Sequence, residues 1–148
     1  MTNTIASILS WFQKGKKQPV SNKDFHTQLG AHFEEVLEMV QEIQSNSPEG
    51  EVVLAKAKLA LMGLKDYCYQ SEGVFSIPNR LNYLDALCDQ IVTNIGCAHM
   101  VQTDIVGATE EVDASNWSKF VDGEPILNEV GKIMKGPNYK PPQLYPFI

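Results

Sequence analysis

The stretch that decides the fold is Leu29–Ile43, which reads LGAHFEEVLEMVQEI. Apolar residues recur in it at steps of three and four, which is the period of one face of an α-helix. This apolar stripe consists of Leu29, Phe33, Val36, Val40 and Ile43. The pattern predicts a long helix from about Lys23 to Ser45, with one face turned toward a core.

Helical patterns also occur on both sides of this stretch. Further helices are predicted at about 1–17, 51–70, 79–102 and 105–120. The helix at 79–102 has an expected core face made of Leu84, Leu87, Cys88, Ile91, Val92 and Ile95. From residue 121 onward glycine and proline recur, which favours turns and a small hairpin over a helix. We therefore predict one all-α domain over 1–148, a helical bundle with an N-terminal helix in 1–20 and an irregular C-terminal arm in 121–148.

The composition excludes several classes of protein. The chain has 148 residues, is 43% hydrophobic and carries a formal charge of −6. This acidic balance argues against general nucleic-acid binding, which depends on neutralising phosphates with lysine and arginine. No apolar run approaches the ~18 residues needed to span a bilayer. The first segment lacks the basic leader and cleavage site of a signal peptide, so we expect a docking helix of the mature protein.

The cysteines and histidines do not form metal-binding motifs. Cys68, Cys88 and Cys97 are far apart, and the three histidines are scattered. Zinc sites usually have cysteine and histidine ligands at close spacing, so no zinc site is expected. We expect buried free thiols, which suits a reducing cytoplasm, or the host cytoplasm for a phage-encoded chain.

Two helices each carry a pair of acidic residues on one face. Glu35 and Glu38 are three positions apart, and Asp85 and Asp89 are four apart. Like charges at such spacing repel, and a bridging Mg²⁺ would turn that repulsion into binding, because this cation prefers carboxylate oxygens. A solvated acidic face, or a polar flank beside the core, explains the same residues without a metal. Spacing alone leaves both interpretations open.

Three blocks of sequence together resemble a known family. The blocks are Phe25–Glu38, Leu84–Val92, and a C-terminal part that combines SNWSKF at 115–120 with GKIMKGPNYKPP at 131–142. In this order they resemble the all-α nucleoside triphosphate (NTP) pyrophosphohydrolases, which include the MazG-like proteins and their phosphoribosyl-ATP pyrophosphohydrolase relatives. The resemblance covers most of residues 25–144. The segment between the acidic pairs is longer here than in compact members.

The resemblance implies Mg²⁺-dependent hydrolysis of an NTP or dNTP to the monophosphate and pyrophosphate, with Mn²⁺ as a substitute metal. Glu35 and Glu38 would be metal ligands, and one of them would take the proton of the attacking water. Asp89 matches the last acid of the family's second pair. The family has its other acid where this chain has Ala86, so Asp85 would take over that role. Glu34 would be a further ligand or orient the water.

The resemblance also implies how the substrate is held and how the chain assembles. Asn116, Lys119, Lys132 and Lys135 would bind the nucleotide, and solvated tail charges are the alternative for the lysines. Purine substrates, dGTP among them, are expected from phage-type members. Homodimers or homotetramers are the family's usual assemblies. A non-catalytic module that binds nucleotide or a partner protein is the alternative function.

Overall fold

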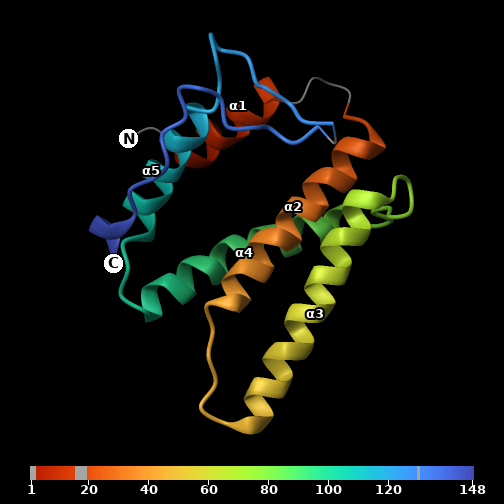
Figure 1. Ribbon diagram of the computed structural model, residues 1–148, viewed down its shortest axis with the longest axis vertical. Coiled ribbons are helices and arrows are strands. Elements are labelled where there is room, and N and C mark those ends of the chain that lie inside the picture. The colour runs from red at the N-terminus through yellow and green to blue at the C-terminus, as the bar shows by residue number, and fades with distance from the viewer. Residues whose placement is uncertain (1–2, 16–19, 130) are drawn as a thin grey trace. The chain divides into compact units, whose positions relative to one another are not determined.

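A computed structural model describes residues 3–15, 20–129 and 131–148. Within them lie α1 (Thr4–Gly15), α2 (Asn22–Gln41), α3 (Pro48–Gln70), α4 (Arg80–Met100) and α5 (Ile105–Trp117), followed by the short 3-10 helix η1 (Tyr145–Phe147), as Figure 1 shows. The predicted all-α class is therefore confirmed. Residues 1–2 and 16–17 of the predicted first helix lie outside the described part.

Polar caps decide where the helices begin. Ser21 accepts a hydrogen bond from the backbone N–H of Asp24, whose carboxylate accepts one from the N–H of Ser21, which is a complete capping box. The side chain of Ser47 caps α3 by accepting a hydrogen bond from the N–H of Gly50, and Pro48 occupies the first turn, where its missing N–H costs nothing. For this reason α3 begins three residues before the predicted start.

The contacts divide the described residues into two units. Unit 1 is drawn from 1–18, 77–127 and 133–148, and unit 2 from 19–76 and 128–132. The organisation as a single domain stays a prediction, and each unit is described by itself below.

Unit 2 is built on an antiparallel pair of helices, α2 and α3, joined by residues 42–47 (Figure 1). They approach closely at Gly30, where an added Cβ would lie 3.0 Å from the Tyr69 ring and 3.2 Å from the Cβ of Cys68. The buried residues of α2 are His26, Thr27, Gly30 and Leu37. The predicted stripe is confirmed only in part: Leu29, Phe33, Val36 and Val40 are half-buried, whereas the fully buried positions lie beside them, where the small Gly30 allows α3 to approach closely. Of the stripe, Ile43 lies beyond α2 and is 47% exposed.

A buried histidine links the two helices at the end where α2 begins and α3 finishes. His26 is 1% exposed. Its Nε2 accepts a hydrogen bond of 3.1 Å from the backbone N–H of Phe75, so Nδ1 carries the hydrogen that it donates to the carbonyl of Asn22 at 2.8 Å. The ring also stacks on Phe75, with centroids 5.8 Å apart. His26 is therefore a satisfied core residue that ties the loop after α3 to the first turn of α2.

In unit 1, α1 packs on α5 through aromatic and polar contacts. The indole N–H of Trp11 donates to the carbonyl of Asn116 at 2.9 Å, and its ring stacks on Phe120. Ser7 receives a hydrogen bond from the Trp117 indole and donates one of 2.6 Å to the carboxylate of Asp113. The first helix is thus held by side chains spread along one face of α5.

The expected core face of α4 is not buried. No described residue of α4 is buried. Leu84 is 59% exposed, Val92 65% and Ile95 50%. The prediction was wrong because α4 has few contacts within unit 1. It meets α5 near the connection between the two helices, and this contact covers only a small part of a 21-residue helix. Cys88 and Cys97, also on α4, are exposed, so only Cys68 fits the expectation of buried thiols.

The C-terminal arm is irregular, as predicted. It holds two isolated antiparallel bridges, Val121 with Glu124 and Leu127 with Ile133. Its end returns to α5, where the carbonyl of Phe147 accepts a hydrogen bond of 2.8 Å from the N–H of Asp104. Among the described residues, no helix is both long and apolar enough to cross a membrane.

Candidate functional site

Two carboxylates of α2 lie exposed on one face of the helix. Glu35 and Glu38 are three positions apart, and both are exposed. Exposed carboxylate oxygens at this spacing are hard donors that suit Mg²⁺, which keeps several waters and needs few protein ligands. The donor set of α2 therefore fits the predicted cation.

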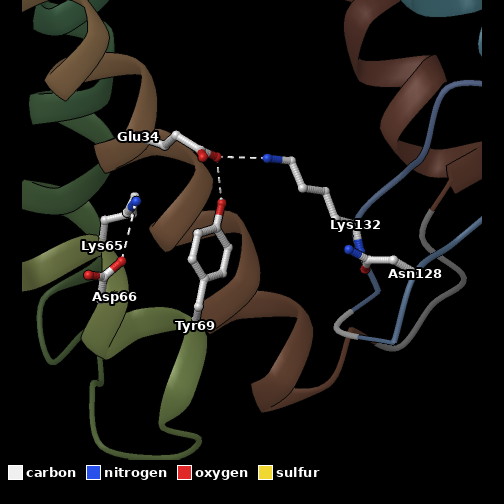
Figure 2. Close-up of polar contacts among 6 residues, drawn as sticks. All are labelled: Glu34, Lys65, Asp66, Tyr69, Asn128 and Lys132. Atoms are coloured by element: carbon white, nitrogen blue, oxygen red, sulfur yellow. Dashed lines mark hydrogen bonds and ion pairs between the residues drawn. The ribbon is translucent and has the colours of Figure 1, made fainter. Parts of the chain in front are cut away.

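Glu34, the third carboxylate of this run, has protein partners. Its Oε2 accepts a hydrogen bond of 2.8 Å from the hydroxyl of Tyr69 on α3 and one of 2.7 Å from the ammonium of Lys132, as Figure 2 shows. Lys132 lies in the turn 128–132, where its backbone N–H donates to the side chain of Asn128 at 2.8 Å. Glu34 therefore joins α2, α3 and this turn, and no metal is needed to explain it.

The ionisation of this cluster follows from its contacts. The hydrogen bond from Lys132 lowers the pKa of Glu34, and partial burial opposes that effect. Burial raises the pKa of Tyr69, and the hydrogen bond and negative charge of Glu34 raise it further. Glu34 is therefore the anion of the cluster, and Tyr69 stays a neutral donor well into the alkaline range.

We expect Tyr69→Phe to lower the free energy of unfolding by about 1 kcal/mol, the usual value of one hydrogen bond. Because the pKa of Tyr69 is raised only in the folded state, wild-type stability is lost as pH rises above the ordinary value of 10.0. Tyr69→Phe should lack this pH-dependent loss of stability. In a titration followed by near-ultraviolet absorbance, the variant should also lack the phenol that ionises at the highest pH. Tyr145→Phe, at a residue 85% exposed, is the control. An unchanged late titration in Tyr69→Phe would contradict the assignment.

The second acidic pair lies on α4. Asp85 and Asp89 are both exposed and stand one helical turn apart. They belong to unit 1, and the glutamates of α2 belong to unit 2. In the part of the chain that the structure describes, no group of three or more histidine, cysteine, aspartate or glutamate side chains could hold a metal ion. A site with four carboxylates thus stays a prediction.

Two of the predicted substrate-binding residues, Lys119 and Lys135, lie near one tyrosine ring of unit 1, and a third, Asn116, contacts Lys119. The ammonium of Lys119 donates to the side-chain oxygen of Asn116 at 2.7 Å. It lies 5.7 Å from the ring centre of Trp11 and 6.0 Å from that of Tyr139. Lys135 lies 4.9 Å from the centre of the same Tyr139 ring. The structure therefore places Asn116 against Lys119, and it places both lysines near the Tyr139 ring.

Lys132 does not share these contacts, because it pairs with Glu34 in unit 2. Sequence reasoning missed both tyrosines, Tyr69 and Tyr139. Tyr139 belongs to the C-terminal block that resembles the family. Its position between Lys135 and Lys140 could have indicated that it lies near the lysines. Tyr69 had none, because its partner lies 35 positions away on another helix.

Comparisons with protein-family models, with characterised proteins and with solved structures gave no match.

Proposed function

We propose that the chain is a Mg²⁺-dependent NTP pyrophosphohydrolase that converts an NTP or dNTP to the monophosphate and pyrophosphate. The observation that carries the proposal is the pair of exposed carboxylates, Glu35 and Glu38, on one face of α2. The sequence resemblance and the second exposed pair, Asp85 and Asp89, support it. Mn²⁺ is proposed as a substitute for Mg²⁺.

The four carboxylates would hold the cation. When bound, Mg²⁺ supplies positive charge against the phosphate oxygens at the α-phosphorus. The proposal requires the pairs of α2 and α4 to act on one substrate, within a chain or between copies. Glu35 or Glu38 takes the proton of the attacking water, since an exposed carboxylate can serve as a general base. Glu34 is held by Lys132 and Tyr69 and is therefore not proposed as a ligand.

Cationic and amide side chains would hold the substrate. Lys119 and Lys135 supply point charges suited to phosphate, and Asn116 fixes the ammonium of Lys119 through its side-chain oxygen. Lys132 would reach a phosphate only by leaving Glu34. We therefore propose Lys119 and Lys135 as the main phosphate-binding lysines, and Lys132 as one that binds only after its ion pair with Glu34 breaks.

The experiment that tests the proposal is incubation of the full chain with each common NTP and dNTP, with Mg²⁺ or Mn²⁺. Release of pyrophosphate and monophosphate in equal amounts is the expected result, with purine substrates such as dGTP turned over fastest. Added EDTA should stop the reaction. Failure of every nucleotide with both metals would refute the enzyme assignment.

The alternative function is a helical module that binds nucleotide or a partner protein without catalysis. One observation favours it: Ala86 stands where the resembled family carries an acid. Tight binding of a nucleotide without pyrophosphate release would support this alternative.

We also propose that the chain assembles as a homodimer or homotetramer, located in the cytoplasm. Apolar side chains of α4 are exposed, and a groove of about 390 Å³ between α1, α4 and α5 is lined by Ile5, Ile91, Ile95, Ile105 and Val106, with Thr4, Asn94 and Thr109. Exposed apolar area of this kind is typical of an interface, and a stable one buries roughly 800 Å² per partner. A monomer of 16.5 kDa in sedimentation at micromolar concentration would refute the assembly.

A further inference from the structure

The exposed side of α4 carries a line of apolar residues that repeats every seven positions. Its members follow one another at alternating steps of three and four: Leu81, Leu84, Cys88, Ile91 and Ile95. All five are exposed, and Leu81 is the most exposed of them at 76%. Strict alternation of these steps places the side chains in one narrow line, which is the pattern by which two helices pack along each other. We call this line the α4 seam.

Two opposite charges flank the start of the α4 seam. Arg80 directly precedes Leu81 and Asp85 directly follows Leu84, so the two charges lie on opposite sides of the line, and both are exposed. In a parallel pair of identical helices, residues on these flanks meet across the interface and decide the choice of partner. Arg80 of each chain would then face Asp85 of the other, five positions further along. An antiparallel pair would place Arg80 near the far end of the partner helix, away from Asp85.

The α4 seam continues into the apolar groove of unit 1. Ile91 and Ile95 also line this groove of about 390 Å³, together with Ile5 of α1 and Val106 of α5. Each partner of a stable interface buries roughly 800 Å², which is more than one short line of side chains provides. A helix bound along the seam would also contact the walls of the groove, and these contacts enlarge the buried area.

We propose that the α4 seam binds the α4 seam of a second copy, with the two helices parallel and in register. This pairing rests on the proposed homo-oligomer and assigns its surface, direction and register. Identical helices are self-complementary in this arrangement, because each seam residue meets its own counterpart and Arg80 meets Asp85. A carboxylate has two oxygens, so the ion pair leaves one oxygen of Asp85 for the proposed cation. Asp89 lies off the seam and stays exposed.

The two cysteines of α4 stand in different places relative to the seam. Cys88 lies in the middle of it, whereas Cys97 lies on another side of the helix, and both are exposed. In a parallel pair in register, Cys88 faces Cys88 of the second copy across the twofold axis. Cys97 stays on the outer surface, away from its counterpart. The pairing therefore predicts that Cys88, and not Cys97, forms a disulfide between two chains when an oxidant is added.

The first test is mild oxidation of the full chain by diamide at micromolar protein concentration, followed by non-reducing electrophoresis. Diamide takes up the two hydrogens of a thiol pair while the S–S bond forms. We expect a linked dimer of twice the 16.5 kDa chain, which Cys88→Ser abolishes and Cys97→Ser, the matched control, leaves unchanged. Leu84→Cys combined with Cys88→Ser should restore the link, because residue 84 again meets its counterpart. An antiparallel pair would separate the two copies of residue 84, and no link would return.

The second test does not depend on thiol chemistry. Ile91→Asp places two negative charges face to face in the seam, so the dissociation constant of the assembly should rise at least about a hundredfold in sedimentation. Met100→Asp is the matched control, because Met100 is 77% exposed and lies off the seam. Circular dichroism should show the same helix content in both variants.

The outcomes separate the pairing from the other proposals. A wild-type chain that sediments as a monomer would refute the assembly and the pairing together. An oligomer that Ile91→Asp leaves intact, or one that oxidation links through Cys97 alone, would keep the assembly and overturn the pairing. A chain that pairs through Cys88 but hydrolyses no nucleotide would refute the enzyme and leave the pairing standing.

Discussion

Replacing Glu38 with Gln, or Asp89 with Asn, is expected to reduce Mg²⁺-dependent pyrophosphate release about a thousandfold. The reason is the loss of a negative oxygen donor at the proposed metal site, where one charge contributes several kcal/mol to the transition state. Both residues are exposed, so the substitutions leave no buried group without a partner. Steady-state release of pyrophosphate measures the effect, and circular dichroism should show unchanged helix content.

A control substitution on α2 tests whether the loss of any one negative charge reduces the rate. Glu42 is the exposed C-cap residue of α2, and Glu42→Gln makes the same change of charge. This variant should keep the wild-type rate. Turnover like the wild type in both Glu38→Gln and Asp89→Asn would exclude the metal assignment, whatever the control does.

Gly30→Leu is expected to lower the free energy of unfolding by about 3 kcal/mol, the upper range for overpacking a tight contact. Even a Cβ at this position would lie 3.0 Å from the Tyr69 ring and 3.2 Å from Cys68, so a larger side chain must separate α2 from α3. Denaturant unfolding followed by circular dichroism measures the loss. The same variant should also disturb Tyr69 and therefore its hydrogen bond to Glu34.

Gly63 provides the matched control. It lies in α3, and a Cβ there would meet no atom within 4 Å. Gly63→Ala should therefore stabilise the protein by up to about 1 kcal/mol through helix propensity alone. If Gly30→Leu unfolds at the same denaturant concentration as the wild type, the close packing of α2 on α3 is wrong.

The helices could be predicted from the sequence because their signals are local. Ser21 with Asp24 is such a signal for α2. Ser47 with Pro48 is an equally local signal for α3, but the predicted start fell three residues later because these residues were assigned to the preceding loop. The fully buried positions of α2 could not be read in this way, although four of the five residues of the predicted stripe are half-buried. Periodicity finds the most apolar side, whereas the contact with α3 is decided by Gly30, whose contribution is the absence of a side chain.

The candidate site shows the same limit. The carboxylate pairs were visible as spacing, but the partner of Glu34 lies 98 positions away, and no local pattern links the two. Lys132 and Lys135 looked equivalent in the sequence, because both are lysines in one glycine-rich segment. They differ in the structure, since one pairs with a glutamate and the other lies on a tyrosine ring.

The pairing of α2 with α3 has a consequence for folding order. All of unit 2 except the turn 128–132 comes from one continuous stretch, 19–76, whereas unit 1 gathers segments from both ends of the chain. Short loops cost less entropy to close, and chains with local contacts fold faster. We therefore expect the amides of α2 and α3 to gain protection first in pulse-labelled hydrogen exchange, before those of α1 and α5.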